Sequence, residues 1–483
     1  MNYTILPFRF ERFNAEEYLL TNDVGEYIFL GNEDFDKFVN YELDPQSDVF
    51  KDIASKQIAT TDKVEDVVSM LATKFRTKKS ILRDFTTLHM VVPTLRCNSS
   101  CIYCQVKRHE STDHSADMTK ETAKNIVKCI FESPSPCIKI EFQGGDPSTD
   151  FEMVKYIIEE AEWLNLFKKR ELGFVICTNL TLLTEDMVKF LKKHNCYIST
   201  SLDGPKEIHD ACRKDWNGEG SFERANAALQ HYKTYYNPNM DKNTKVTIAP
   251  ENLENFNTIV DYFSESDIDV IFANPVYEAK WTVEHAKTYY KELKRLANKM
   301  LENDNIYCSR FSETAYRPQQ TSENQNWCGG DGSMLAFDPD GIAYPCLRYM
   351  ESSLGGSQPP LIVGNVEEGI YNTEESLKLK KELNSITRRS QSTDECFHCP
   401  ISVGCAWCSA WNYQETGSFN KRSTNICWMH RAEPIANVYY WNMKYIRDGR
   451  EKRFPFYLEQ KYALEIIDED EYNHLLTLSF CME

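Results

Sequence analysis

The sequence predicts an α/β fold: an open, partial barrel of six strand–helix repeats, followed by a cysteine-rich domain. Between residues 86 and about 305, apolar runs of strand character alternate with helical stretches, and such alternation indicates a parallel sheet. Six repeats are too few to close an eightfold barrel. Beyond residue 306 helical periodicity fades while Cys, Gly and Pro concentrate, so a domain of different character follows.

Length and composition place the chain among ordinary globular proteins. Its 483 residues suffice for two or three domains, and 41% hydrophobic with 27% charged residues is typical of a globular chain. The formal net charge of −18 argues against binding a nucleic-acid backbone, which needs a basic face. No apolar run approaches the ~18 to 20 residues of a membrane span, and residues 1–13 lack a signal-peptide core. We therefore expect a cytoplasmic protein that binds neither nucleic acid nor membrane.

Residues 1–85 are expected to form a small α+β unit. Tyr18–Thr21 and Glu26–Leu30 are apolar runs separated by a turn at Asp23–Gly25, which predicts a β-hairpin. Residues 33–41 have a helical pattern. A second helix is predicted by five apolar residues at helical spacing, Val64, Val67, Val68, Leu71 and Phe75.

Within residues 86–305 the elements follow one another in regular order. Strands are expected at 88–92, 137–142, 173–178, 197–202, 245–248 and 269–273. Helices are expected at 119–132, 151–167, 184–194, 221–236, 252–264 and 283–303. Loops that follow the carboxyl ends of parallel strands are where α/β barrels place their chemistry.

Three cysteines lie on the loop that follows the first strand. Cys97, Cys101 and Cys104 have C-x3-C-x2-C spacing within eight residues. Three thiolates on one short loop can hold three irons of a [4Fe–4S] cluster and leave the fourth iron open to a substrate or cofactor. A structural zinc loop is the alternative, because cysteines at short spacing also bind zinc. In a reducing compartment, 17 cysteines favour metal or cluster ligation over disulfides.

The same loop resembles the signature of radical S-adenosylmethionine (SAM) enzymes, in which an aromatic residue, here Tyr103, precedes the last cysteine. The resemblance implies a partial (β/α)6 radical SAM barrel, with the three cysteines as ligands of the catalytic cluster. It further implies that the open iron binds the amino and carboxylate groups of SAM. Reductive cleavage of SAM would then give a deoxyadenosyl radical that abstracts a hydrogen atom from the substrate.

Further candidates for binding SAM follow the next strands. Gly144, Gly145, Asp146 and Pro147 resemble the family's Gly-Gly-Glu-Pro motif, which offers acceptors to the SAM ammonium group. Asn179 stands where the family often has Thr-Asn-Gly. Ser201-Leu202-Asp203-Gly204-Pro205 and Arg213 resemble a block of peptide-modifying members, which makes Ser201 and Arg213 candidates for the ribose and the carboxylate of SAM. Taken alone, the Gly and Pro runs would be turns and Arg213 a surface residue.

Seven cysteines of the last third resemble the SPASM domain of peptide maturases, which holds two auxiliary [4Fe–4S] clusters. They are Cys328, Cys346, Cys396, Cys399, Cys405, Cys408 and Cys427. The family's pattern assigns one cluster to Cys396, Cys399, Cys405 and Cys427, and the other to Cys328, Cys346 and Cys408. Only two residues separate Cys405 from Cys408, where the family has three, so this partition stays open. Zinc knuckles are the alternative.

Leu347 and Arg348 follow Cys346, where sulfatase-maturing relatives carry a carboxylate that acts as a base. This difference argues against a sulfatase-type dehydrogenation of Ser or Cys.

The resemblance covers residues 88–430 and implies a radical SAM/SPASM peptide maturase. Three segments more specifically resemble the maturase of His-Xaa-Ser systems (HxsB type): the opening Leu6–Phe10, the segment Tyr18–Leu30 and residues 90–105. That implies a ribosomally made precursor peptide with His-Xaa-Ser repeats as substrate, and an electron donor and a second radical SAM enzyme as partners. The unit 1–85 is similar to winged-helix modules that capture a leader peptide as an added strand, and a structural cap on the barrel is the alternative.

We therefore expect four parts: a leader-recognition unit at 1–85, the barrel at 86–305, the SPASM domain at 306–430 and a helical extension at 431–483. Two other classes of protein stay open. One is a radical SAM enzyme that acts on a protein or a small molecule. The other is a non-enzymatic, zinc-binding interaction protein.

Overall fold

The computed structural model describes residues 3–82, 86–235, 243–266, 270–313, 330, 333–401, 405, 407–451, 453–456 and 458–480. The chain divides into two compact units, Met1–Phe85 and Thr86–Glu483. Each unit has a hydrophobic core of its own.

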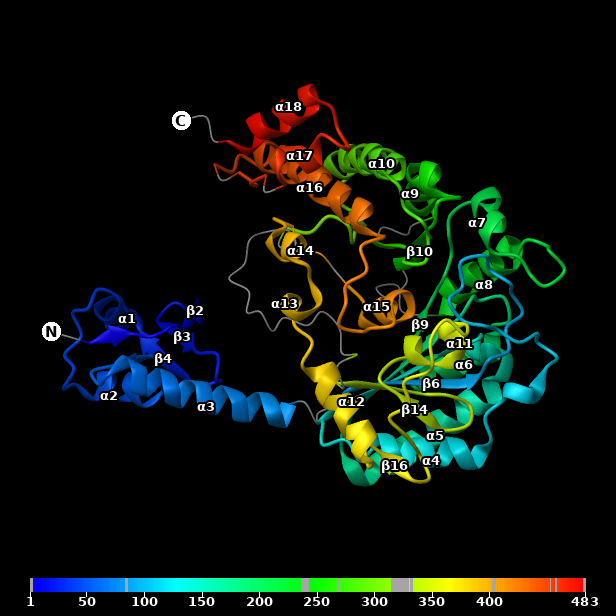
Figure 1. Ribbon diagram of the computed structural model, residues 1–483, viewed down its shortest axis with the longest axis horizontal. Helices are drawn as coiled ribbons and strands as arrows, with labels where there is room; N and C mark the ends of the chain where they lie inside the picture. Colours follow the sequence, from blue (N-terminus) through cyan, green and yellow to red (C-terminus); the bar gives the residue numbers. More distant parts are fainter. Residues whose placement is uncertain are drawn as a thin grey trace. The chain divides into compact units, whose positions relative to one another are not determined.

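In the first unit, three antiparallel strands in the order β2-β3-β4 form the main sheet (Figure 1). The predicted hairpin is confirmed as β3 (Glu17–Thr21) and β4 (Tyr27–Gly31), and Gly25 in its turn has a φ of 89°, a region that favours glycine. β2 (Arg9–Arg12) pairs with β3, so the first strand of the hairpin is the middle strand of the sheet. The sequence did not predict β2, because its exposed residues lack the alternation of a half-buried strand.

Apolar residues of two helices pack with those of the sheet in the core of this unit. α1 (Asn32–Val39) and α3 (Val64–Leu82) confirm the two predicted helices. α2 (Asp48–Ser55) was not predicted; it begins after Ser47, whose side chain accepts a hydrogen bond from Phe50 N at 3.2 Å. β1 (Thr4–Ile5) pairs with β5 (Ala59–Thr60). The buried core includes Leu20, Leu30, Phe38, Phe50 and Ile53.

The second unit contains the six predicted strands in sequence order. They are β6 (Leu88–Thr94), β7 (Cys137–Gly144), β8 (Glu171–Cys177), β9 (Cys196–Ser199), β10 (Asn243–Ile248) and β11 (Val270–Pro275). Neighbouring strands pair in parallel, and a parallel bridge between Ser201 and Lys245 connects β9 to β10. The predicted partial barrel of six parallel strands is therefore confirmed.

Helices follow the strands in turn and cover the outside of this sheet (Figure 1). They are α4 (Lys120–Ile130), α5 (Phe151–Lys168), α6 (Glu185–Lys193), α7 (Lys206–Cys212), α8 (Phe222–Tyr235), α9 (Phe256–Glu265) and α10 (Val283–Glu302). All but the short α7 were predicted. Short 3-10 helices lie at η1 (His114–Ala116), η2 (Pro147–Asp150) and η3 (Leu253–Asn255).

Beyond the barrel, the chain returns to the sheet and extends it. β13 (Met334–Phe337) pairs in parallel with the free edge of β6, and β14 (Ile342–Tyr344), β15 (Gly364–Asn365) and β16 (Gly369–Ile370) continue antiparallel. The result is an eight-stranded sheet in the order β16-β15-β14-β13-β6-β7-β8-β9, while β12 (Tyr307–Cys308) pairs with β11. The C-terminal cysteine region is therefore anchored beside the first strand of the barrel.

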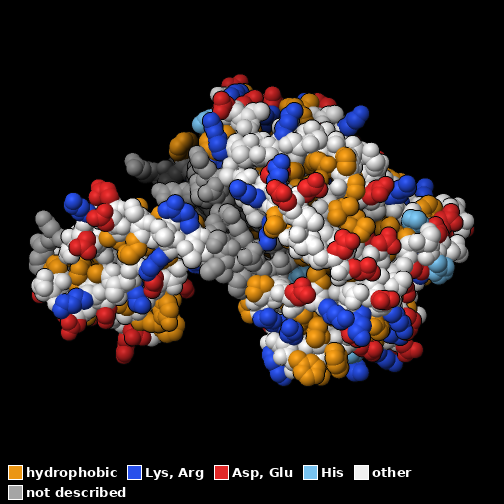
Figure 2. Space-filling model, turned by 60° about the horizontal axis from the view of Figure 1, so that its bottom comes forward, with side chains coloured by type: hydrophobic (Ala, Val, Ile, Leu, Met, Phe, Trp, Pro, Cys, Tyr) orange, Lys and Arg blue, Asp and Glu red, His pale blue; other side chains and the backbone are white. Residues whose placement is uncertain are grey.

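Helices complete the C-terminal part. They are η4 (Leu347–Tyr349), α11 (Glu351–Leu354), α12 (Glu374–Asn384), α13 (Arg388–Gln391), α14 (Asp394–His398), α15 (Ser409–Thr416), α16 (Cys427–Arg447), α17 (Gln460–Ala463) and α18 (Glu469–Ser479). α16 packs along α10, where the buried Tyr289 hydroxyl donates to Glu433 at 3.2 Å. None of the described helices is both long and apolar enough to cross a membrane. Acidic and basic side chains are interspersed over the face that Figure 2 presents.

Candidate functional site

The cysteine triad lies on a loop that leaves the carboxyl end of β6, and distant segments hold this loop in place. Ser100 N donates to the carbonyl of Lys214 at 2.7 Å. The indole Nε1 of Trp216 donates to the carbonyl of Cys97 at 2.8 Å, although the two residues are 119 positions apart. Both bonds come from the segment that follows α7. The loop is therefore positioned by the barrel and not by its own sequence alone.

The three thiols differ in exposure. Cys97 is buried, Cys101 is half-buried and Cys104 is exposed. Burial, together with the nearby Asp146 carboxylate, raises the pKa of the Cys97 thiol to about 12, and burial also raises the pKa of Cys101. Because iron binds thiolates, loading this loop would displace protons that the buried thiols otherwise keep. The loop is open on the Cys104 side, which fits a metal group with an accessible coordination position.

A buried carboxylate, Asp203, links two of the predicted site residues. It accepts a hydrogen bond from the Tyr103 hydroxyl and a second from Arg213 Nε at 2.8 Å. The Arg213 guanidinium also lies over the Tyr103 ring, 5.3 Å from its centre. Asp203 thus balances the buried charge of Arg213 and orients the aromatic residue inside the triad. Sequence reasoning named Asp203 only as a member of the Ser201–Pro205 block, with a turn as the alternative, and gave it no role of its own.

Asp146 is buried after β7, and four protein donors occupy its carboxylate. Ser148 donates to Oδ1 from its backbone N at 2.9 Å and from its hydroxyl at 2.5 Å. Thr178 Oγ1 lies 3.0 Å from both carboxylate oxygens, and Asn179 N donates to Oδ2 at 2.7 Å. Burial raises the pKa of this carboxyl group, and the hydrogen bonds oppose that shift. An ammonium group at this motif would therefore meet main-chain carbonyls and not the Asp146 carboxylate.

Gly144 and Gly145 run beside the start of the triad loop at a distance that excludes side chains. A Cβ on Gly145 would lie 2.1 Å from the carbonyl oxygen of Arg96. One on Gly144 would lie 2.3 Å from Cγ1 of Val92, and the φ of Gly144 is 113°. Asp146 N donates to the same Arg96 carbonyl at 2.7 Å. The motif is thus a main-chain neighbour of the residue before Cys97.

Asn179 contacts the triad loop directly, whereas Ser201 lies at a strand junction. Asn179 Nδ2 donates to Asn98 Oδ1 at 2.8 Å and to Ser99 Oγ at 3.1 Å, and it lies 3.9 Å from Cys97 Sγ. Ser201 forms the bridge between β9 and β10. Of these two candidates, the structure brings Asn179 to the cysteines.

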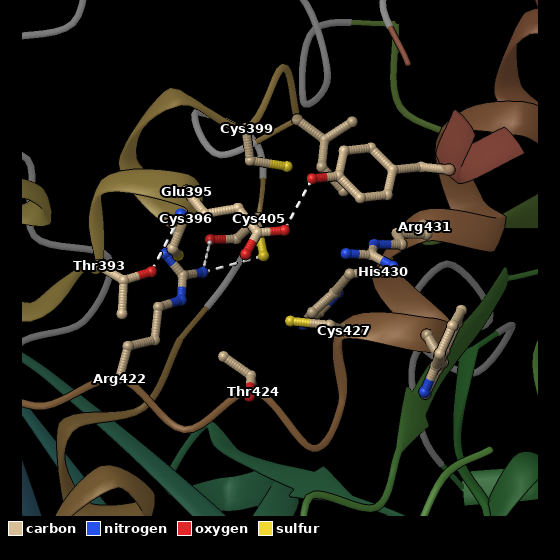
Figure 3. Close-up of a pocket in the computed structure, with 13 residues that line it drawn as sticks. Thr393, Glu395, Cys396, Cys399, Cys405, Arg422, Thr424, Cys427, His430 and Arg431 are labelled. Carbon is tan, nitrogen blue, oxygen red and sulfur yellow. Dashed lines mark hydrogen bonds between the residues drawn. The ribbon is translucent and has the colours of Figure 1, made fainter. Parts of the chain in front are cut away.

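Four of the C-terminal cysteines line one cavity of about 260 Å³, which we call the four-cysteine cavity (Figure 3). Cys396 lies in α14, Cys399 follows that helix directly, and Cys427 begins α16. The fourth, Cys405, is buried. These are the residues that the family pattern assigns to one cluster. Four cysteine sulfur atoms that line one cavity match the donor set of an iron–sulfur cluster.

Cys346 and Cys408 lie beside a half-buried arginine, Arg348. Its backbone N donates to Cys346 Sγ at 3.3 Å, and its Nη1 lies 4.0 Å from Cys408 Sγ. Its guanidinium also donates to Gln105, which follows the triad, and to Glu278, which follows β11. Arg348 therefore connects the triad loop with this second group of cysteines, a contact that sequence reasoning did not foresee.

The third predicted member of that group, Cys328, lies outside the described residues. Among the residues that the structure does describe, no three His, Cys, Asp or Glu side chains are arranged to hold a single metal ion.

Comparison with known proteins agrees with this geometry. Residues 91–263 match the family model of the radical SAM superfamily, and this segment contains the triad, the Gly-Gly motif and Arg213. The segment is therefore similar to that superfamily, and the chain is an enzyme with the α/β fold of this class. This similarity implies a [4Fe–4S] cluster and SAM as cofactors.

Two curated relatives extend the similarity. The cysteine-type anaerobic sulfatase-maturating enzyme of Clostridium perfringens is 27% identical over 271 residues, which are 53% of this chain and 72% of the relative. The radical SAM cyclopropyl synthase TigE of Paramaledivibacter caminithermalis is 21% identical over 367 residues, 71% of this chain and 70% of the relative.

Two solved structures share the fold. The native anSMEcpe with bound AdoMet has a TM-score of 0.58 at 20% identity and covers 75% of this chain and 98% of its own. Streptococcus suis SuiB bound to its precursor peptide SuiA has a TM-score of 0.52 at 15% identity, covering 88% of this chain and 99% of its own.

Proposed function

We propose that this enzyme is a peptide maturase that uses SAM to modify a ribosomally made precursor peptide. The observation that carries the proposal is the presence, in one compact unit, of the cysteine triad, exposed at Cys104, and of the separate four-cysteine cavity. A triad with an open side suits the binding of SAM, while a cavity lined by four cysteines suits an auxiliary [4Fe–4S] cluster. Cys346 and Cys408, with Cys328, are the proposed ligands of a second auxiliary cluster.

The chain's own residues hold the SAM site in shape. When bound, the cofactors supply a deoxyadenosyl radical that removes a hydrogen atom from the substrate. Asn179 fixes the triad loop through Asn98 and Ser99. Asp203 fixes Tyr103 and Arg213, and Arg213 is the residue proposed to face the SAM carboxylate. Ser201 is proposed for the ribose.

The first unit is proposed to bind the leader of the precursor. β2 and β4 are the end strands of its sheet, so an extended peptide has an edge to which it can add. On the outer face the exposed ring of Phe13 lies 4.9 Å from that of Phe29, which in turn lies 6.1 Å from Tyr27. These rings offer apolar contacts to alternate side chains of an added strand. Sequence reasoning expected an edge near Tyr18 to Leu30; Tyr18 lies in the middle strand β3, whereas Leu30 lies in the end strand β4.

Relatives with known substrates support a peptide as the substrate class. A structure similar to this chain is described with a bound Cp18Cys peptide, and SuiB with its precursor SuiA. Within this class we propose a precursor of the His-Xaa-Ser type, modified in the cytoplasm with an electron donor and a second radical SAM enzyme as partners. A small-molecule or folded-protein substrate is the competing proposal.

SAM cleavage by the reconstituted enzyme tests the core of this proposal. Under a strong reductant the wild type should release deoxyadenosine, and the triple variant Cys97→Ala, Cys101→Ala, Cys104→Ala should release none, because alanine cannot bind iron. Cys129→Ala is the matched control, since it removes a thiol of α4 outside every motif. Undiminished cleavage by the triple variant would refute the site.

Binding of a labelled precursor then separates the substrate classes. A peptide maturase should bind the His-Xaa-Ser precursor and convert it only when SAM is present. Stoichiometric zinc at the C-terminal cysteines, with no precursor binding, would instead identify an interaction protein.

A further inference from the structure

The four-cysteine cavity contains a buried arginine that points at one of its sulfur atoms. Arg422 Nη2 donates to Cys405 Sγ at 2.9 Å and to the Cys405 carbonyl at 3.0 Å (Figure 3). Arg422 is only 9% exposed. A buried guanidinium needs a compensating negative charge, and four thiolates with bound iron would supply it.

A buried histidine lines the same cavity. His430 is 4% exposed, and neither ring nitrogen finds a hydrogen-bond partner among the described residues. The Oε2 atom of Glu433 lies 4.0 Å from Nδ1, beyond hydrogen-bond distance. His430 follows Cys427 by three positions on α16 and so lies on the same face of that helix. Because an unpaired buried nitrogen is costly, His430 is placed for a group that binds in the cavity.

Arg422 and His430 would both stabilise negative charge on a cluster bound in the cavity. An iron–sulfur cluster with four thiolate ligands is negatively charged, and reduction adds one more electron to it. Hydrogen bonds and positive charge near the sulfur atoms stabilise the reduced state more than the oxidised state, and so raise the reduction potential. The cysteine spacing alone gives no information on this environment.

We propose that Arg422 and His430 are hydrogen-bond donors to the auxiliary cluster of the four-cysteine cavity, and that they raise its reduction potential. This inference rests on the auxiliary cluster of the proposed function. Both are positioning residues, because Arg422 acts through Cys405 and His430 touches no substrate.

Arg431 offers a matched control in the same cavity. Its guanidinium pairs with Glu465 at 3.1 Å and lies over the rings of Trp428 and Tyr462. Arg431→Gln therefore removes one positive charge from the cavity lining and leaves the bond between Arg422 and Cys405 in place.

The test is a potentiometric titration of the full chain, followed by electron paramagnetic resonance. Alanine at Cys97, Cys101, Cys104 and Cys346 leaves the four-cysteine cavity as the remaining cluster site, and the titrant supplies the single electron. This quadruple variant is the reference protein. At its midpoint potential, adding Arg422→Gln should lower the ratio of reduced to oxidised cluster about tenfold, which corresponds to a fall in reduction potential of about 59 mV for a one-electron couple. His430→Leu should lower it about threefold. Arg422→Lys should keep most of the reference potential.

The outcomes distinguish a failure of the roles of Arg422 and His430 from a failure of the auxiliary cluster itself. Iron present at an unchanged potential in Arg422→Gln overturns the role of Arg422, and an unchanged potential in His430→Leu overturns that of His430. An equal shift in Arg431→Gln would mean that only the total charge of the cavity matters, which also overturns the inference. Absence of iron from the reference protein overturns the auxiliary cluster itself, and this result is read from iron content before any titration.

Discussion

At the residue scale, the buried carboxylate of Asp203 controls the geometry of the triad loop. It is inaccessible to solvent and pairs with the buried Arg213. Asp203→Asn keeps the shape but removes the charge, so the guanidinium stays buried without compensation. We expect a loss of about 3–5 kcal/mol in the free energy of unfolding, measured by urea denaturation of the metal-free protein.

Glu159→Gln is the control for this substitution, because it neutralises an exposed carboxylate on α5. It should change the free energy of unfolding by less than about 0.5 kcal/mol. Equal stability of Asp203→Asn and wild type would show that Arg213 has another source of compensation.

A second residue-level prediction concerns His89 in β6. Burial lowers its pKa to about 4, well below the value of an exposed histidine. Between about pH 6.5 and pH 4 the unfolded chain therefore binds a proton that the folded chain does not. The folded state should lose about 3 kcal/mol of stability as the pH falls through this window. His89→Leu should remove this part of the pH dependence.

The measurement is urea denaturation at a series of pH values between 4 and 7. His474→Leu, at an exposed position of α18, should leave the slope of stability against pH as in the wild type. If His89→Leu keeps that slope as well, other groups cause the sensitivity to acid.

Some of the site residues could be predicted from the sequence and others could not. The cysteine triad could be predicted because its ligands lie within one short loop, where spacing alone defines the chemistry. The role of Asp203 could not be predicted, because its partner Tyr103 is 100 positions away in the sequence. His430 and Arg422 have no pattern of their own; only folding shows that both line the cavity of the four cysteines.

At the scale of elements, the contact between the Gly-Gly turn and the strand before the triad sets the position of the loop. Gly145→Ala would bring a Cβ to 2.1 Å from the Arg96 carbonyl, and this backbone cannot move without displacing Cys97. A displacement of about 1 Å at a reacting site lowers rates about 100-fold. We expect a loss of SAM cleavage of that order, with less iron bound at the triad.

Gly173→Ala is the matched control, since a Cβ there meets nothing within 4 Å. It lies in β8 of the same sheet and should retain both SAM cleavage and iron. Wild-type activity of Gly145→Ala would mean that the close approach is not needed for catalysis.

Elements were predictable where their pattern is local. The six barrel strands are buried apolar runs separated by amphipathic helices, so period and order identify them. β13 was not predicted, because its four residues form a strand only against the edge of β6, more than two hundred positions earlier. β2 was missed for a related reason, since its pairing with β3 gives an exposed strand without an apolar face.

At the scale of the whole molecule, the separate hydrophobic cores of the two units imply a division of tasks. The core of the first unit, which includes Leu20, Phe38 and Phe50, is formed by its own residues. The triad and the four-cysteine cavity belong to the second unit. A unit with its own core can be removed without exposing the apolar interior of the other. Peptide capture and SAM chemistry should therefore be separable by deletion.

The last prediction applies this to the variant that lacks residues 1–85. If the first unit binds the leader, the variant should cleave SAM without peptide at the wild-type rate within about twofold, while the affinity for the precursor falls at least about tenfold, or 1.4 kcal/mol. In the full chain, the double variant Phe13→Ser, Phe29→Ser should also lower the affinity for the precursor, because both rings are exposed on the outer face of the sheet. Met70→Ala, also exposed but on α3, is the control and should bind normally. A structural cap predicts the opposite result: deletion would expose apolar barrel surface, cause aggregation and abolish SAM cleavage. Fluorescence titration of a labelled precursor, beside deoxyadenosine release, distinguishes the two roles.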